Sequence, residues 1–153
     1  MRLLLDTMYL LPAIGVSVKN LPKDAVVKLM HKGHKISISD VSLFELSAKG
    51  AKHVAAGTLS AERVIRGIRA IIYDERITVI PMHESSVLMT GFKLRGLLSD
   101  FIDCLILSSA INQNDAIVTE DKGIQNLNRN KEFNVILSVI NPKFKIQTLT
   151  ETL

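Results

Sequence analysis

The sequence predicts an α/β fold in which a parallel sheet is covered by helices on both faces. Short apolar runs alternate with helical patterns along the chain, and the connections between runs are long enough to contain a helix. Such crossover connections join parallel strands, because antiparallel neighbours need only a tight turn. The runs at 2–6 and 115–119 are also nearly continuous in aliphatic residues, which is typical of strands buried on both faces.

Five segments have the composition of strands. They are 2–6, 35–39, 76–80, 115–119 and, as a last β segment, 134–140. The first and fourth are apolar runs followed by an acid, and the second alternates as KISIS. The third is the β-branched run RITVI, which Pro81 closes. The segment 134–140 (NVILSVI) is also apolar and β-branched, and it precedes Asn141-Pro142.

Six segments have a helical pattern. They are 23–33, 40–49, 60–74, 84–97, 100–112 and a short segment that starts at Lys122. Gly33 is the expected C-cap of the first helix, and Asp40 is the expected N-cap of the second, which should stop before Gly50. The third has Glu62 in its first turn and repeats apolar residues on one face. The fifth opens with two acids and is otherwise so apolar that we expect it deep in the core.

Composition limits the class of protein. With 153 residues, 47% of them hydrophobic and 22% charged, the chain can bury a sizeable core, and no linker interrupts it, so we expect a single domain over 1–153. The net charge of +4 favours an anionic partner such as nucleic acid. One cysteine, Cys104, allows neither a disulfide nor a thiolate metal site. No segment has the pattern of a signal peptide or a membrane span, so we expect a soluble, cytoplasmic protein.

Four carboxylates stand at strand ends or near helix starts. Asp6 and Asp121 follow the first and fourth expected strands, Glu45 lies in the second helix, and Asp103 stands at the head of the core helix. Ligands bind beyond the carboxyl ends of parallel strands, and like charges buried together need a cation or a proton. Oxygen ligands alone favour Mg²⁺ or Mn²⁺, which can generate hydroxide for phosphodiester hydrolysis. Taken singly, Asp121 suits a helix cap equally well, whereas Asp6 precedes no obvious helix.

Four segments, in order along nearly the whole chain, resemble the successive motifs of the PIN domain. They are Leu3–Thr7 (LLLDT), Ser39–Leu46 (SDVSLFEL), Asp103–Ala110 (DCLILSSA) and Ala116–Asp121 (AIVTED). The length of the chain is similar to that of stand-alone, VapC-like members. The resemblance implies a three-layer α/β/α sandwich with a central, mainly parallel sheet. It also implies cleavage of RNA that depends on Mg²⁺ or Mn²⁺.

Carried over residue by residue, the resemblance implies a metal site and a hydroxyl that orients a water or a carboxylate. The metal-binding acids are Asp6, Glu45, Asp103 and Asp121, and the hydroxyl belongs to Thr119. Thr7 fits the Asp-Thr pair of the first motif. Asp100, one helical turn before Asp103, either joins the site or caps the helix. Either Glu120 or Asp121 faces the metal, and the family pattern prefers Asp121.

Three functions compete on this basis. The first is an endoribonuclease in which a metal-bound water attacks the phosphodiester. For this function the resemblance also implies two partners: a small antitoxin that would block the acidic groove, and a second copy of the chain in a homodimer. The second is a catalytically inactive PIN-like module that binds RNA or protein, and the presence of all four acids argues against it. The third is a receiver-type domain, but the acid pair on the first strand and the lysine after the fifth are not visible. With two Tyr and no Trp, RNA contacts should rest on phosphates.

Overall fold

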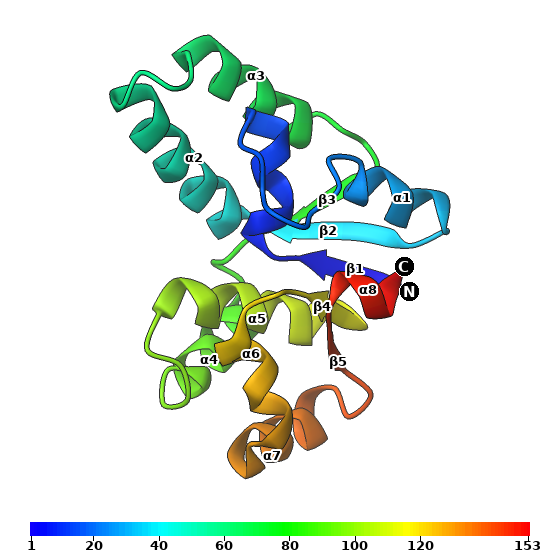
Figure 1. Ribbon diagram of the computed structural model, residues 1–153. Helices are drawn as coiled ribbons and strands as arrows, with labels where there is room; N and C mark the ends of the chain where they lie inside the picture. Colours follow the sequence, from blue (N-terminus) through cyan, green and yellow to red (C-terminus); the bar gives the residue numbers. More distant parts are fainter.

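The computed structural model describes residues 1–153, and a single sheet runs through its centre (Figure 1). Its strands are β1 (Arg2–Leu5), β2 (Lys35–Ser39), β3 (Ile77–Ile80), β4 (Ala116–Val118) and β5 (Lys145–Gln147). Their order across the sheet is β3-β2-β1-β4-β5, and every neighbouring pair is parallel. The predicted parallel α/β fold is confirmed, and β1, the first strand of the chain, lies at its centre.

Helices cover both faces of the sheet (Figure 1). One face carries the 3₁₀ helix η1 (Thr7–Ile14), α1 (Ala25–His31), α2 (Asp40–Ala55) and α3 (Ala61–Ile72). The other carries α4 (Ser85–Leu94), α5 (Phe101–Gln113) and α7 (Lys131–Ile140). The shorter helices are α6 (Lys122–Gln125), the 3₁₀ helix η2 (Asn126–Arg129) and α8 (Leu149–Thr152). The sheet with its two helical layers is the expected α/β/α sandwich.

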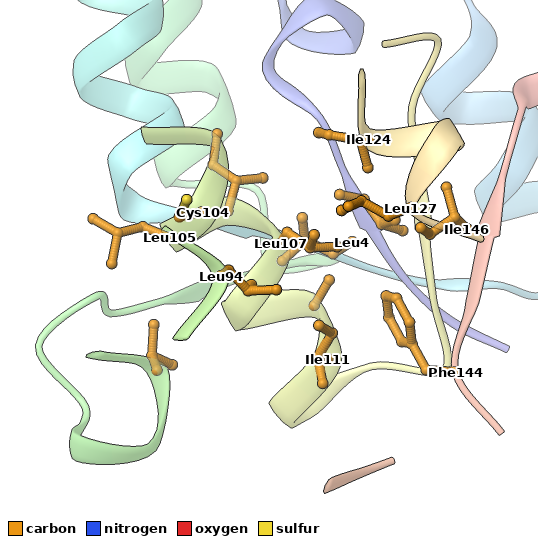
Figure 2. Close-up of a cluster of buried hydrophobic side chains, with 14 of the residues drawn as sticks. Leu4, Leu94, Cys104, Leu105, Leu107, Ile111, Ile124, Leu127, Phe144 and Ile146 are labelled. Carbon is orange, nitrogen blue, oxygen red and sulfur yellow. The ribbon is translucent and has the colours of Figure 1, made fainter. Parts of the chain in front are cut away.

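Alternation along β1 divides the core between the two helical layers. Leu3 and Leu5 belong to the hydrophobic cluster under η1 and α1–α3, whereas Leu4 points into the cluster under α4, α5 and α7. Figure 2 shows this second cluster, in which Leu4 lies near Leu107 and Ile111 of α5. All three β1 leucines are completely buried, so the strand is fixed from both sides. No helix in the fold is long and apolar enough to serve as a membrane span.

The last expected strand is wrong, because 134–140 lies in helix α7. The Asn130 side chain caps this helix by accepting from the Phe133 amide at 3.0 Å. Phe133 and Leu137, one turn apart, face the core, whereas Val135 and Val139 are 64% and 79% exposed. Burial at i and i+4 is helical periodicity, which the β-branched composition of the segment concealed. The fifth strand comes later, at β5, and pairs with β4.

Two further expectations about helix ends need correction. Helix α2 does not stop before Gly50 but continues to Ala55, and the buried Gly50 allows Val64 of α3 to approach closely. Its N-cap is Ser39, whose hydroxyl accepts from the Val41 amide, and Asp40 occupies the first turn. Gly33 follows α1 with a φ of 84°, as expected for a residue that ends a helix.

Candidate active site

Register places Asp6 and Thr119 side by side at the carboxyl edge of the sheet. Leu5 of β1 pairs with Val118 of β4, and the Asp6 amide donates to the Val118 carbonyl at 3.1 Å. Asp6 and Thr119, which follow this pair in the two strands, therefore lie beside each other. The Thr119 hydroxyl donates to Asp6 Oδ2 at 2.6 Å, and Thr119 is completely buried. Two chain segments 113 residues apart are thereby joined at one carboxylate.

Asp6 does precede a helix, contrary to expectation. It is the N-cap of η1, and its Oδ1 accepts from the Thr7 amide at 2.7 Å. The segment that follows carries Pro12 and forms a short 3₁₀ helix, so it lacked the apolar periodicity that marks an α-helix. Both carboxylate oxygens of Asp6 thus accept a hydrogen bond, one from η1 and one from Thr119.

Asp121 is held by the same hydroxyl from the other direction. The Asp121 amide donates to Thr119 Oγ1 at 3.1 Å, so this hydroxyl receives one bond and gives another to Asp6. Asp121 Oδ1 caps α6 by accepting from the Ile124 amide at 2.9 Å. The capping role and the position at the strand end, which the sequence left as alternatives, are therefore combined in one residue.

Asp103 and Glu45 approach this edge from the two helical layers. Helix α2 starts directly after β2, which puts Glu45 in its second turn, and Asp103 lies in the first turn of α5. Burial, followed by the charges of Asp100, Asp6, Asp121 and Glu45 in that order, raises the pKa of Asp103 to about 7. The four predicted acids therefore act on one another electrostatically.

The same negative field acts on Asp6. Burial raises its pKa, the bonds from Thr119 and Thr7 oppose that rise, and the charges of Glu45 and Asp121 add to it. No lysine or arginine forms an ion pair with these acids. The three ion pairs of the chain join Arg2 to Asp115, Lys28 to Asp24 and Arg76 to Asp74. No protein cation is therefore ion-paired with the acidic cluster.

The residues fit a hard divalent cation in charge and chemistry. Their donors are carboxylate oxygens with no Cys or His among them, which is the preference of Mg²⁺ or Mn²⁺. Two buried hydroxyls nearby have no protein hydrogen-bond partner. That of Thr7 directly follows Asp6, and that of Ser42 lies in the first turn of α2. As they stand, no three His, Cys, Asp or Glu side chains converge closely enough to hold an ion.

Asp100 and Glu120 lie in different environments. Asp100 caps α5 by accepting from the Ile102 amide at 2.9 Å, and of the neighbouring charges it raises the pKa of Asp103 the most. It therefore caps the helix and adds to the negative field. Glu120 Oε1 instead accepts from the Tyr9 hydroxyl at 2.8 Å and from the Leu149 amide at 2.9 Å. The carboxylate of Glu120 is thus engaged with η1 and α8.

Arg95 is a neighbour of the site that the sequence did not single out. It follows α4, donates to the Leu98 carbonyl at 3.3 Å, and its positive charge opposes the rise that burial causes in the pKa of Cys104. Cys104 adjoins Asp103, so a guanidinium lies near the head of α5. A basic residue in the turn before an acidic helix start was the available signal, but it was one of many scattered cations.

These features define an α/β protein with an uncompensated acidic cluster at the carboxyl edge of a parallel sheet. The chain belongs to the PIN domain family, whose model matches residues 3–130. Members of this family are generally nucleases. A solved structure described as VapBC2 from Rickettsia felis, bound to a DNA fragment from their promoter, matches with a TM-score of 0.59 and 21% identity. The match covers 97% of this chain and 98% of that one, and at this identity it shows the shared fold. No curated protein matches the chain.

Proposed function

We propose that this protein is a cytoplasmic, divalent-metal-dependent endoribonuclease that hydrolyses RNA phosphodiester bonds. Asp6, Glu45, Asp103 and Asp121 would hold Mg²⁺ or Mn²⁺. The observation that carries the proposal is the position of Asp6 and Asp121 at one edge of the sheet, where both bond to the Thr119 hydroxyl and neither is ion-paired with a protein cation. A bound ion would supply an activated water and stabilise charge on the phosphate.

The chain's own residues have separable tasks in this proposal. Thr119 holds the Asp6 carboxylate and the Asp121 backbone in fixed relation. Asp103, with a pKa near neutrality, becomes fully ionised once a cation is close, because positive charge lowers a carboxyl pKa. Arg95 lies near the head of α5 and would contact the phosphate backbone. Such contacts give little base specificity and a steep dependence on salt.

A cleavage assay with a matched acid control tests the proposal. Purified protein is incubated with several RNA classes in EDTA, Mg²⁺ or Mn²⁺, beside the variants Asp103→Asn and Asp24→Asn. Asp24 is an exposed carboxylate paired with Lys28 on another part of the surface, so its replacement is a comparable change outside the site. We expect metal-dependent products from the wild type and Asp24→Asn and none from Asp103→Asn. Equal cleavage by pure, folded Asp103→Asn would refute the assignment.

The alternative of an inactive RNA- or protein-binding module has one observation in its favour. No three metal-ligating side chains converge on a single point in the present arrangement. If the protein is such a module, RNA binding should persist in EDTA and no product should form at any concentration of Mg²⁺ or Mn²⁺. A filter-binding titration with and without EDTA separates the two functions.

We also propose that the protein is the toxin of a toxin–antitoxin pair, with a small antitoxin as partner. The structure with the same fold is described as a VapBC2 complex on promoter DNA, and the acidic edge is a surface that a basic segment of a partner could cover. Expression of the wild type should stop growth of a bacterial host, whereas Asp103→Asn should leave growth unchanged. Equal toxicity of both chains would contradict a toxin role based on this site.

A homodimer is the second partner that we propose, through α4. Met89 and Phe92 on this helix are 60% and 61% exposed, and the Phe92 ring stacks on Phe101 with 5.9 Å between centroids. Exposed apolar side chains grouped in this way often mark protein interfaces. Light scattering should give the mass of two chains for the wild type and of one chain for Phe92→Asp. A monomeric wild type would exclude the dimer.

A further inference from the structure

We propose that Glu120 is a positioning residue, which fixes the loop that carries Thr119 and Asp121 without contacting the metal. The inference rests on the proposed metal-dependent function and assigns a role to a carboxylate that the sequence left ambiguous. It also means that the C-terminal segment 131–153, which lies beyond the part of the chain matched by the PIN model, helps to hold the candidate active site in place.

The first contact ties Glu120 to the helix that Asp6 caps. Glu120 Oε1 accepts from the Tyr9 hydroxyl at 2.8 Å, and the Tyr9 side chain is only 2% exposed. The Tyr9 amide in turn donates to the Asp6 carbonyl at 3.1 Å. A rigid, buried aromatic side chain therefore connects Glu120 to the first turn after Asp6. Moving the Glu120 backbone would break this bond or displace Tyr9 from the core.

The second contact ties Glu120 to the end of the chain. The same Oε1 accepts from the Leu149 amide at 2.9 Å, and Leu149 is buried in the cluster that contains Leu3, Leu5 and Tyr9. One residue earlier along the loop, the Thr119 amide donates to the Gln147 carbonyl of β5 at 3.0 Å. The C-terminal segment thus holds two successive residues of the loop.

The anchor at Leu149 is itself well fixed. Thr148 and Glu151 form a capping box at the start of α8, in which the Thr148 amide donates to Glu151 Oε2 at 2.7 Å. Leu149, the first residue of α8, then buries its side chain in the core. A short helix that is capped and anchored in this way presents the Leu149 amide in one orientation.

These contacts leave Asp121 as the carboxylate that faces the acidic cluster. Glu120 directs its carboxylate to Tyr9 and Leu149, and the charge of Asp121 is among those that act on both Asp6 and Asp103. Partners that orient metal ligands from outside the coordination shell strongly affect metal affinity, because they remove the need for ligands to be ordered on binding. Loss of Glu120 should therefore weaken the site although no ligand is lost.

The test compares Glu120→Ala, Glu120→Gln and Tyr9→Phe by Mn²⁺ titration, with free Mn²⁺ followed by electron paramagnetic resonance. Glu120→Ala removes the acceptor and should weaken Mn²⁺ binding about 10-fold. Glutamine keeps an Oε1 that can accept from both donors, so Glu120→Gln should stay within about 2-fold of the wild type. Tyr9→Phe removes one of the two donors and should lie between them. With RNA, we expect kcat to fall in Glu120→Ala while KM stays constant.

The outcomes separate a positioning role from a ligand and from a merely structural residue. Equal losses in Glu120→Gln and Glu120→Ala would make Glu120 a metal ligand and overturn the inference. Unchanged Mn²⁺ affinity in Glu120→Ala would also overturn it, even if melting in EDTA occurred at a lower temperature. Should Glu120→Ala fail to fold, Tyr9→Phe carries the test, since it leaves the carboxylate free to hydrate. If the wild type itself does not bind Mn²⁺, the proposed function fails first; Asp103→Asn serves as the reference for lost binding.

Discussion

Replacing Asp103 by Asn should stabilise the metal-free protein while it removes activity. The folded state raises the pKa of this carboxyl from 3.8 to about 7. A raised acid pKa means that the associated stability is present below the unfolded value and is lost as pH rises through the folded value. At pH 8 the wild type therefore keeps an ionised Asp103 in an unfavourable place, whereas the neutral amide of the variant escapes this penalty.

The size of the effect follows from the shift. A change from 3.8 to about 7 corresponds to at most about 4 kcal/mol. Because Asp103 is only half-buried, solvent screening should reduce this to about 1–2 kcal/mol. For a chain of this length, that raises the melting temperature by roughly 5 °C. At pH 5 the folded wild type is protonated at this site, so the difference should be clearly smaller.

Differential scanning fluorimetry or calorimetry at pH 5 and pH 8, in EDTA and in Mn²⁺, measures this directly. We expect Asp103→Asn to melt above the wild type at pH 8 in EDTA, and Mn²⁺ to raise the wild type alone. Asp24→Asn, a change at an exposed position outside the site, should melt at the same temperature as the wild type under each of these conditions. A variant that melts below the wild type at pH 8 in EDTA would refute the account of Asp103 as an uncompensated carboxylate.

Three other predictions follow from the site and its framework. Asp6→Asn and Glu45→Gln should each abolish Mn²⁺-dependent RNA cleavage with the circular dichroism spectrum preserved; full activity in either would remove that acid from the metal site. Arg95→Ala should raise KM several-fold with kcat unchanged and flatten the salt dependence of RNA binding, and an equal fall in kcat would instead mean a role in the chemical step. Gly67→Ala should lower the free energy of urea unfolding by about 1–3 kcal/mol, because an added Cβ would overlap the Ala13 carbonyl. Gly96→Ala should be nearly neutral, because there the Cβ would meet the Lys93 carbonyl oxygen at 3.7 Å, an ordinary contact distance.

Much of the sheet could be predicted because its strands have strong local patterns. The run before Asp6 and the run before Thr119 are aliphatic and short, and burial on both faces is the physical reason for that composition. Segment 134–140 has a similar composition, yet it is helical because Asn130 caps it and Phe133 and Leu137 reach the core on one face. Composition alone does not separate a buried strand from a helix of this length.

The sequence indicated a candidate set of acids but not the contacts that these residues make. Strand ends and helix starts indicated the four acids, since parallel strands present their carboxyl ends at one edge. The different environments of Glu120 and Asp121 were not predictable. The carboxylate of Glu120 is engaged by a tyrosine 111 residues earlier and by a backbone amide 29 residues later in the chain. Hydrogen bonds of such sequence separation leave no local pattern.

The position of β1 at the centre of the sheet has a consequence for synthesis of the protein. Asp6 leaves the ribosome well before the hydroxyl that holds its carboxylate, which is translated 113 residues later. The backbone partners of Thr119 and Glu120 in β5 and α8 come later still. A growing chain therefore carries Asp6 and Glu45 before their arrangement can form, and it gains that arrangement only after β5 and α8 have emerged. If the chain is the nuclease proposed above, it would be inactive toward the ribosome and messenger that produce it until β5 and α8 have been translated.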